Sequence, residues 1–303
     1  MFENSSAVCP LTGASGHVRQ TRTGGELLQA YETRYGLTIP PALAAAYFEH
    51  TFSEHECPSS GLRWFTPAVV GGADFYEFLS KSLPWYYNAD TWDKQRALAV
   101  LQHLGCRSMF EAGCGSGELL RAAIATGLAA AGSELNALQI ESAGRAGLAV
   151  YAPDEIPDTL SVDALVMLQV LEHVPRPLEF TRALVRRVRP RYLLLAVPAF
   201  ETLLGRTTDP LVWPPHHISF WSARALAKLA GAMGADLVEV AYEPLAWPQF
   251  AAVAGGEPQG RLCYLPPVRF RRCLWLTYQI GRCLRRRWAL RAHTVFGVFK
   301  FPS

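Results

Sequence analysis

Residues 108–117 restrict what this chain can fold into more than any other stretch. An apolar run ends at Glu111, three glycines follow at Gly113, Gly115 and Gly117, and a helical pattern begins directly after them. Glycines at a turn from a strand into a helix allow positive φ and let a ligand approach more closely than a side chain would permit. The stretch therefore predicts a ligand site at the end of a strand.

The spacing of these glycines argues against a dinucleotide. A pyrophosphate-binding turn reads G-x-G-x-x-G, and here Glu118 stands at the third glycine position, where its carboxylate would face the phosphates. Glu111, just before the turn, suits hydroxyl or ammonium groups. The nucleoside of S-adenosylmethionine has no phosphate and fits this turn better than NAD does.

From Cys106 onward, strand and helix patterns alternate, which is typical of an α/β fold with a doubly wound parallel sheet. The predicted strands are 108–111, 129–134, 148–151, 164–168, 192–197, 235–242 and 294–301. The predicted helices are 117–126, 136–146, 177–188 and 223–233. Ligands of such sheets bind at the carboxyl ends of the strands, so the loops that leave the strands should hold the site.

Three motifs resemble those of the class I S-adenosylmethionine-dependent methyltransferases, and within that family the ubiquinone-pathway and similar small-molecule enzymes. The motifs are EAGCGSG at 111–117, VLEHV at 170–174 and PPHHISFWS at 214–222. The resemblance implies a seven-stranded Rossmann-like sheet and S-adenosylmethionine as cofactor. It also implies in-line transfer of the methyl group to a small-molecule acceptor, with O-methylation favoured. A non-catalytic descendant that binds the cofactor is the alternative.

The resemblance also assigns cofactor contacts. Glu134 would hold both ribose hydroxyls, and its alternative is to cap the helix 136–146. Asp154 or Glu155 would accept the hydrogen bond of the adenine amine, and Gln169 would lie against the methionine part of the cofactor. The remaining cofactor-binding candidates are Glu111, Gly113, Cys114, Gly115, Gly117 and Leu135.

The long loop 198–222 should carry the contacts with the acceptor. It contains His216 and His217, and histidine is the side chain suited to take a hydroxyl proton near neutral pH. In an extended segment neighbouring residues point opposite ways, so at most one of the two would face the methyl group, and His216 is the candidate for the specific contact. Alternatively, both brace the loop against Trp213 and Trp221.

The run 169–174, QVLEHV, supplies His173 as a third catalytic candidate. In the ubiquinone-pathway enzymes that it resembles, this run begins with an acid and has been linked to metal binding. Gln169 replaces that acid here and removes a charge that a hard cation would need, so we predict no metal. Glu172 and His173 are expected mainly to orient the loop before the helix 177–188.

Residues 1–80 repeat one pattern, CPLTG from Cys9 and CPSSG from Cys57. In many relatives this pattern is C-P-x-C-G, and the region resembles a small zinc-binding module. Thr12 and Ser60 replace the second cysteines here, and neutral hydroxyls are poor zinc ligands. We therefore expect a degenerate module that folds without metal.

Two other segments differ in composition from the rest of the chain, one rich in aromatic residues and one rich in arginine. The aromatic-rich stretch 67–87 and the predicted helix 90–104 should lie over the cofactor as a lid, pack between module and core, or both. The insertion 244–291 carries an arginine-rich helical pattern at 268–291, which favours a solvated basic surface, with peripheral contact with anionic membranes as the alternative. The core is then 81–243 and 292–303.

Composition sets the remaining limits. Half of the 303 residues are hydrophobic, enough for a large core, and a net charge of +3 is too small to indicate nucleic acid. Seven cysteines, an odd number at scattered spacings, favour a reduced, cytoplasmic setting over a disulfide framework. Neither a signal peptide nor a membrane-spanning run is evident.

Overall fold

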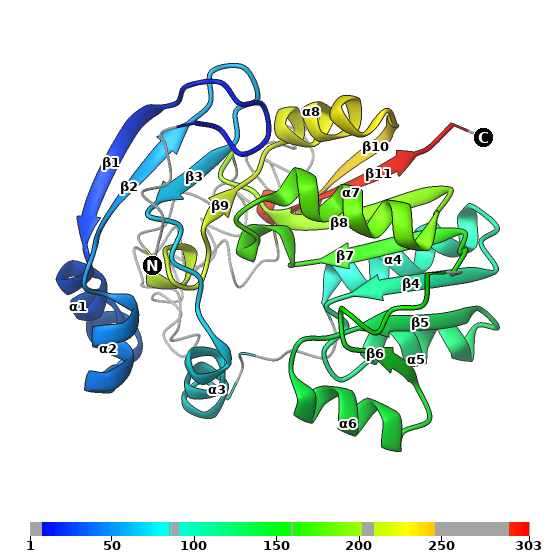
Figure 1. Ribbon diagram of the computed structural model, residues 1–303, viewed down its shortest axis with the longest axis horizontal. Coiled ribbons are helices and arrows are strands. Elements are labelled where there is room, and N and C mark those ends of the chain that lie inside the picture. Colours follow the sequence, from blue (N-terminus) through cyan, green and yellow to red (C-terminus); the bar gives the residue numbers. More distant parts are fainter. Residues whose placement is uncertain are drawn as a thin grey trace, which may run out of the picture.

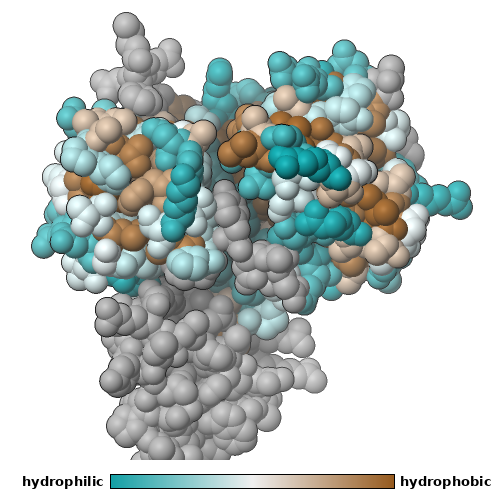
Figure 2. Space-filling model, turned by 90° about the horizontal axis from the view of Figure 1, so that it is seen from below, coloured by the Kyte–Doolittle hydropathy of each residue, from teal (hydrophilic) through white to brown (hydrophobic). Residues whose placement is uncertain are grey.

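The computed structural model describes residues 8–84, 86, 91–158, 160–201, 209–245 and 291–302. Two sheets organise them (Figure 1). A seven-stranded sheet forms the core, and a four-stranded sheet belongs to the N-terminal module. In Figure 2 the two parts are separate lobes, with hydrophobic residues scattered among hydrophilic ones over both.

The core sheet has the strand order β10-β11-β8-β7-β4-β5-β6. Its five parallel strands are β4 Ser108–Ala112, β5 Ala129–Ser133, β6 Ala149–Tyr151, β7 Ala164–Leu168 and β8 Tyr192–Pro198. The last two strands, β10 Asp236–Pro244 and β11 Arg291–Lys300, form an antiparallel pair, and β11 also runs antiparallel to β8. The predicted seven-stranded α/β sheet is thereby confirmed.

Helices cover both faces of this sheet because its central strands are apolar on both sides. In β7, Leu165 and Met167 pack toward α7 and α8, whereas Val166 and Leu168 pack toward α4, α5 and α6. The five helices are α4 Trp92–His103, α5 Glu118–Ala125, α6 Ala137–Arg145, α7 Pro177–Val188 and α8 Ala223–Met233. Ser222 caps α8, and its hydroxyl accepts from the backbone nitrogen of Ala225 at 3.1 Å.

The N-terminal module folds around an antiparallel sheet. Its elements are β1 His17–Thr23, α1 Gly24–Tyr35, α2 Pro41–Tyr47, β2 Thr51–Glu56, β3 Arg63–Thr66 and α3 Ala73–Ser82. Between α1 and α2, Gly36 ends the first helix and Pro40 and Pro41 begin the second. A fourth strand, β9 Ser219–Phe220, comes from the long loop after β8 and pairs with β3. The module and that loop therefore share one sheet.

Hydrogen bonds join the two cysteine turns of the module. The Cys9 sulfur lies 3.6 Å from the Ser60 hydroxyl, and the Cys57 sulfur lies 3.3 Å from Thr12 and 3.1 Å from Ser59. Burial alone would raise the pKa of the Cys57 thiol, but the surrounding hydroxyls outweigh it and lower that pKa to about 6. The two hydroxyls that replace cysteines thus bond to the two remaining sulfurs.

Most of the predicted insertion 244–291, including all of the basic segment 268–291 except Arg291, lies outside the described residues. Within the described part of the chain, no helix combines the length and apolar character that crossing a membrane requires.

Candidate active site

The glycine turn after β4 is left-handed at all three glycines, with φ values of 73° at Gly113, 54° at Gly115 and 81° at Gly117. A Cβ on Gly113 would lie 2.8 Å from Val170, and one on Gly117 would lie 2.4 Å from Leu148. These two glycines allow close packing within the protein. A Cβ on Gly115 would meet nothing within 4 Å, so Gly115 is the one that faces open space. The turn therefore leaves room for a ligand at Gly115.

Glu134 lies beside this opening. Its carboxylate accepts the backbone N–H of Gly115 at 2.8 Å, and those of Leu135 at 2.7 Å and Asn136 at 3.0 Å. The N-cap of α6 is Asn136, whose side chain accepts from Leu138. The capping role is thus taken by Asn136, and the three backbone donors fix the Glu134 carboxylate at the rim of the turn.

Glu111 lies beneath the turn, and only 3% of it is exposed. Burial raises the pKa of its carboxyl to about 8, against the attraction of Lys94. Its Oε2 atom has no hydrogen-bond partner among the described residues. A buried acid with an unpaired oxygen is suited to a hydroxyl or ammonium group of a ligand.

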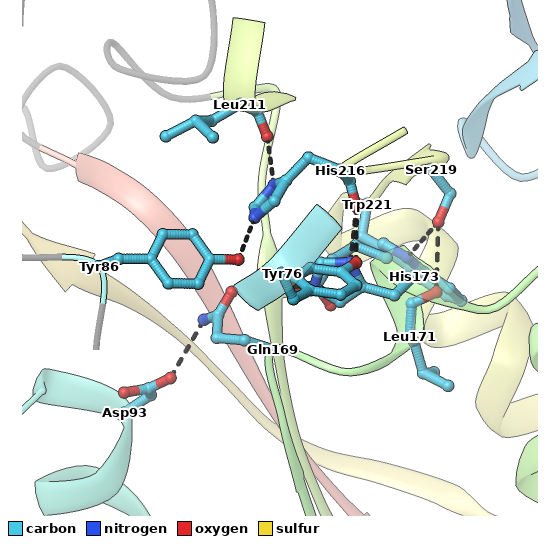
Figure 3. A network of polar contacts seen from close by, with 11 residues as sticks. Tyr76, Tyr86, Asp93, Gln169, Leu171, His173, Leu211, His216, Ser219 and Trp221 are labelled. Atoms are coloured by element: carbon cyan, nitrogen blue, oxygen red, sulfur yellow. Dashed lines mark hydrogen bonds and ion pairs between the residues drawn. The ribbon is translucent and has the colours of Figure 1, made fainter. Parts of the chain in front are cut away.

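The N-terminal end of α4 lies against the same opening. Gln169, at the end of β7, adopts a left-handed backbone with φ of 55°, which is uncommon for a residue other than glycine. Its amide nitrogen donates to the buried Asp93 of α4 at 3.1 Å (Figure 3). Next along α4, Lys94 lies 3.8 Å from Glu118 of α5. The helix α4 thus contacts Gln169 at the end of β7 and the first residue of α5.

The other predicted cofactor residues differ in exposure. Cys114 is buried, and its sulfur would lie 3.0 Å from a Cβ on Gly132, so its side chain points into the protein. Leu135 is 85% exposed at the rim. Asp154 and Glu155 are both exposed in the turn after β6, and nothing in their contacts distinguishes them as partners of an adenine.

The two adjacent histidines do not lie in the extended segment that we assumed. The backbone N–H groups of His216 and His217 both donate to the carbonyl of Trp213, at 3.0 and 3.1 Å, and so fold residues 213–217 into a tight turn. The two imidazole rings lie side by side, with centroids 4.3 Å apart and an angle of 33° between their planes. Both rings therefore join one cluster instead of pointing in opposite directions.

Both ring nitrogens of His216 are engaged. Its Nδ1–H donates to the carbonyl of Leu211 at 2.6 Å, because a carbonyl can only accept. Its Nε2 atom accordingly accepts the hydroxyl of Tyr86 at 2.6 Å. In Figure 3 the Tyr86 hydroxyl lies between His216 and Gln169. The tyrosine hydroxyl therefore donates to the histidine turn.

His173 occupies the other side of the cluster. Its Nδ1–H donates to the His216 carbonyl at 2.6 Å, and the Tyr76 hydroxyl lies 2.9 Å from the same nitrogen. Its Nε2 atom is 3.9 Å from the carboxyl of Glu172, which is fully buried. Neither oxygen of Glu172 nor the Nδ1 atom of His217 has a hydrogen-bond partner among the described residues. His173 thus contacts the turn at 213–217, and its expected role in orienting the loop before α7 stays a prediction.

Burial keeps this cluster neutral. It lowers the pKa of His173 to about 4 and that of His216 to about 3, and it holds the pKa of His217 well below the ordinary value. Burial likewise raises the pKa of Glu172 well above its usual range. Glu172, His173 and His217 each offer a ligand atom within 4.8 Å of the others, a spacing that could hold a metal ion.

Three residues of the site were not predicted individually: Tyr76 and Tyr86, which contact the histidines, and Asp93, which contacts Gln169. The aromatic-rich stretch 67–87 signalled that tyrosines would lie near the site. Nothing in the pattern showed which of them reach the histidines, because those contacts join residues 97 and 130 positions apart.

Comparison with known proteins gives a family match. The methyltransferase domain family matches residues 86–240, just over half of the chain. Among solved structures, an S-adenosylmethionine-dependent methyltransferase from Archaeoglobus fulgidus is 16% identical, with a TM-score of 0.48 over 75% of this chain and 99% of that one. A putative sarcosine dimethylglycine methyltransferase from Galdieria sulphuraria is also 16% identical, with a TM-score of 0.47 over 68% of this chain and 84% of that one.

Among proteins of curated function, none matches the chain by sequence. The family match nevertheless spans the glycine turn, Glu134 and the histidine of the run 169–174. The chain belongs to the methyltransferase domain family and is an S-adenosylmethionine-dependent methyltransferase.

Proposed function

We propose that this enzyme methylates a hydroxyl group of a small-molecule acceptor, as do the ubiquinone-pathway and similar small-molecule methyltransferases. The observation that carries the proposal is the cluster of histidine and tyrosine side chains next to the end of β7, in which His216 is buried and neutral and accepts from the Tyr86 hydroxyl. A hydroxyl must lose its proton during methylation, and a neutral imidazole is the form that accepts one.

The proposed cofactor site uses the open side of the glycine turn. The space at Gly115 admits the cofactor, and the carboxylate of Glu134 accepts the ribose hydroxyls at the rim. Glu111 faces the ammonium group of the methionine part, and its unpaired oxygen favours that position. Gln169 lies along the same part, Leu135 contributes its exposed side chain, and Asp154 or Glu155 accepts from the adenine.

The proposed chemistry is a direct displacement. When bound, S-adenosylmethionine supplies a methyl group on a sulfonium, and transfer of that methyl makes the attacked hydroxyl strongly acidic. The low pKa of His216 makes it a weak base, so it takes the proton as the methyl group moves and not beforehand. The proton reaches Nε2 through the Tyr86 hydroxyl, which already donates to that atom. Leu211 accepts from Nδ1–H and keeps Nε2 free to receive it.

The proposal uses no metal ion. Glu172 is held neutral by burial, so the set of Glu172, His173 and His217 carries no net charge that would attract a hard cation. Gln169 supplies an amide where an additional acid would strengthen such a site. Addition of a chelator should therefore leave turnover unchanged.

A screen of hydroxylated small molecules with isotope-labelled S-adenosylmethionine tests the proposal. We expect the label to appear in an O-methyl product, detected by mass spectrometry. Methylation confined to amines or carbon atoms would overturn O-methylation. Binding of S-adenosylhomocysteine without turnover of any acceptor would instead favour a non-catalytic cofactor-binding protein.

A further inference from the structure

The histidine turn is held by the N-terminal module. A short 3-10 helix, η3 Pro210–Val212, immediately precedes the turn and packs against α1 of the module. The hydroxyl of Tyr31 in α1 donates to the Pro210 carbonyl at 3.4 Å, and Tyr31 itself is fully buried. A helix near the N-terminus of the chain thus contacts a loop of the core almost 180 residues later.

Asp209 is the central residue of this contact. The Tyr35 hydroxyl lies 2.7 Å from both of its carboxylate oxygens, and the Nε atom of Arg34 lies 3.1 Å from Oδ2, an ion pair without hydrogen-bond geometry. The Arg34 and Asp209 side chains are only 12% and 13% exposed. Partly buried charges of this kind are costly to leave unpaired, so the contact strongly favours one geometry.

The same carboxylate fixes the start of η3. Asp209 is its N-cap, and Oδ1 accepts the backbone N–H of Leu211 at 2.9 Å. The carbonyl of Leu211 then accepts from Nδ1–H of His216. Two residues of α1 are therefore connected to the imidazole of His216 through Asp209 and a single turn of helix.

The module also holds the other side of the histidine turn. The backbone N–H of Gly71 donates to the Pro215 carbonyl at 2.8 Å, and that of Phe65 donates to the Ile218 carbonyl at 3.0 Å. The Trp213 ring packs on Phe65, with centroids 4.7 Å apart. The module therefore fixes the histidine turn on both sides. The contacts of α1 with Asp209 and Pro210 then determine the position of η3 relative to the ring of His216.

We propose that Arg34 and Tyr35 of the module are positioning residues for methyl transfer and that they act through Asp209 to fix the orientation and tautomer of His216. This role rests on the proposed function of His216. It makes the module a structural part of the acceptor site, although none of its α1 residues needs to touch the acceptor.

The first readout is the tautomer of His216, which requires no acceptor. Nitrogen-15 NMR of the full chain, assigned by the signal lost in His216→Gln, should show the Nδ1–H form in the wild-type protein. Arg34→Gln and Tyr35→Phe should give a mixture of tautomers or the Nε2–H form. Arg19→Gln is the matched control, because Arg19 forms an ion pair with Glu56 in the same module and does not reach the loop.

The second readout is kinetic. Once an acceptor is known, Arg34→Gln and Tyr35→Phe should lower kcat roughly 10-fold or more and leave the affinity for S-adenosylhomocysteine unchanged. Misplacing a catalytic group by about 1 Å can lower the rate about 100-fold. Arg34→Lys, which keeps the charge, should restore part of the loss. Arg19→Gln should retain the wild-type kcat.

The two readouts separate the inference from the function on which it rests. If Arg34→Gln and Tyr35→Phe both keep the wild-type tautomer, the connection through Asp209 is refuted, whatever their activity. A changed tautomer with wild-type kcat would refute the positioning role. A changed tautomer in a protein that methylates only amines or carbon atoms would contradict the proposed function and leave the structural connection standing.

Discussion

Replacing Glu111 by Gln should make the stability of this protein less sensitive to pH. Glu111 is almost fully buried, and its pKa in the folded protein is about 8, against an ordinary value of 4.5. Glutamine has nearly the shape of the protonated acid and cannot ionise. The variant should therefore match the wild-type protein at low pH and exceed its stability above about pH 4.5, where the unfolded wild-type chain releases the Glu111 proton that the folded protein keeps.

The direction of this pH dependence follows from which state of the protein, folded or unfolded, binds the Glu111 proton more tightly. Between pH 4.5 and about 8 the folded protein keeps the proton and the unfolded chain releases it, so the stabilising contribution of protonated Glu111 is lost as pH rises through that range. One such group changes the free energy of unfolding by at most about 1.4 kcal/mol per pH unit. Between pH ~5.5 and ~7.5 the gain of the variant over wild type should grow by about 2–3 kcal/mol.

Urea unfolding at these two pH values measures this gain directly, without cofactor. Glu141→Gln is the control, because Glu141 is an exposed acid in a surface ion pair with Arg145 on α6. It should leave the pH dependence as in wild type. If Glu111→Gln shows the same gain at both pH values, or none, then Glu111 ionises normally and its assignment as a buried, ligand-facing acid fails.

Three further predictions concern other parts of the chain. Elemental analysis of the purified protein should find no zinc in the module; one equivalent that disappears on mutating Cys9 and Cys57 would contradict this. His216→Gln should lower kcat by roughly 10²–10⁴-fold, the usual contribution of a proton acceptor, with cofactor affinity intact; the same loss in His217→Gln alone would transfer the role to that residue. If 268–291 contacts anionic membranes, vesicle sedimentation should weaken with salt, because charge attraction is screened over about 8 Å at physiological ionic strength; absence of sedimentation at low salt would refute the contact.

The core could be predicted from the sequence because local signals agree there. The strand β7 and the helices α7 and α8 have the predicted bounds, since β7 is a continuous apolar run, α7 begins at a proline and α8 follows the N-cap Ser222. The glycine turn was predictable for the same reason, as strand, glycines and helix follow directly in the chain.

The acceptor side could not be predicted in the same way because long-range contacts determine it. The strand β9 is two residues long and has no periodicity to detect, and its partner in β3 is some 150 positions away. The turn at 213–217 depends on hydrogen bonds to the Trp213 carbonyl, so the assumption of an extended segment failed there. Likewise, Asp209 becomes significant only once α1 is known to lie beside it.

The central claim is that the glycine turn and Glu134 hold S-adenosylmethionine, and calorimetric titration with S-adenosylhomocysteine tests it most directly. Gly115→Val should abolish binding, because its side chain fills the space left open in the turn. Glu134→Ala should weaken binding by about 1.5–3 kcal/mol, the cost of losing charged hydrogen bonds. Wild-type affinity in both variants would contradict the account.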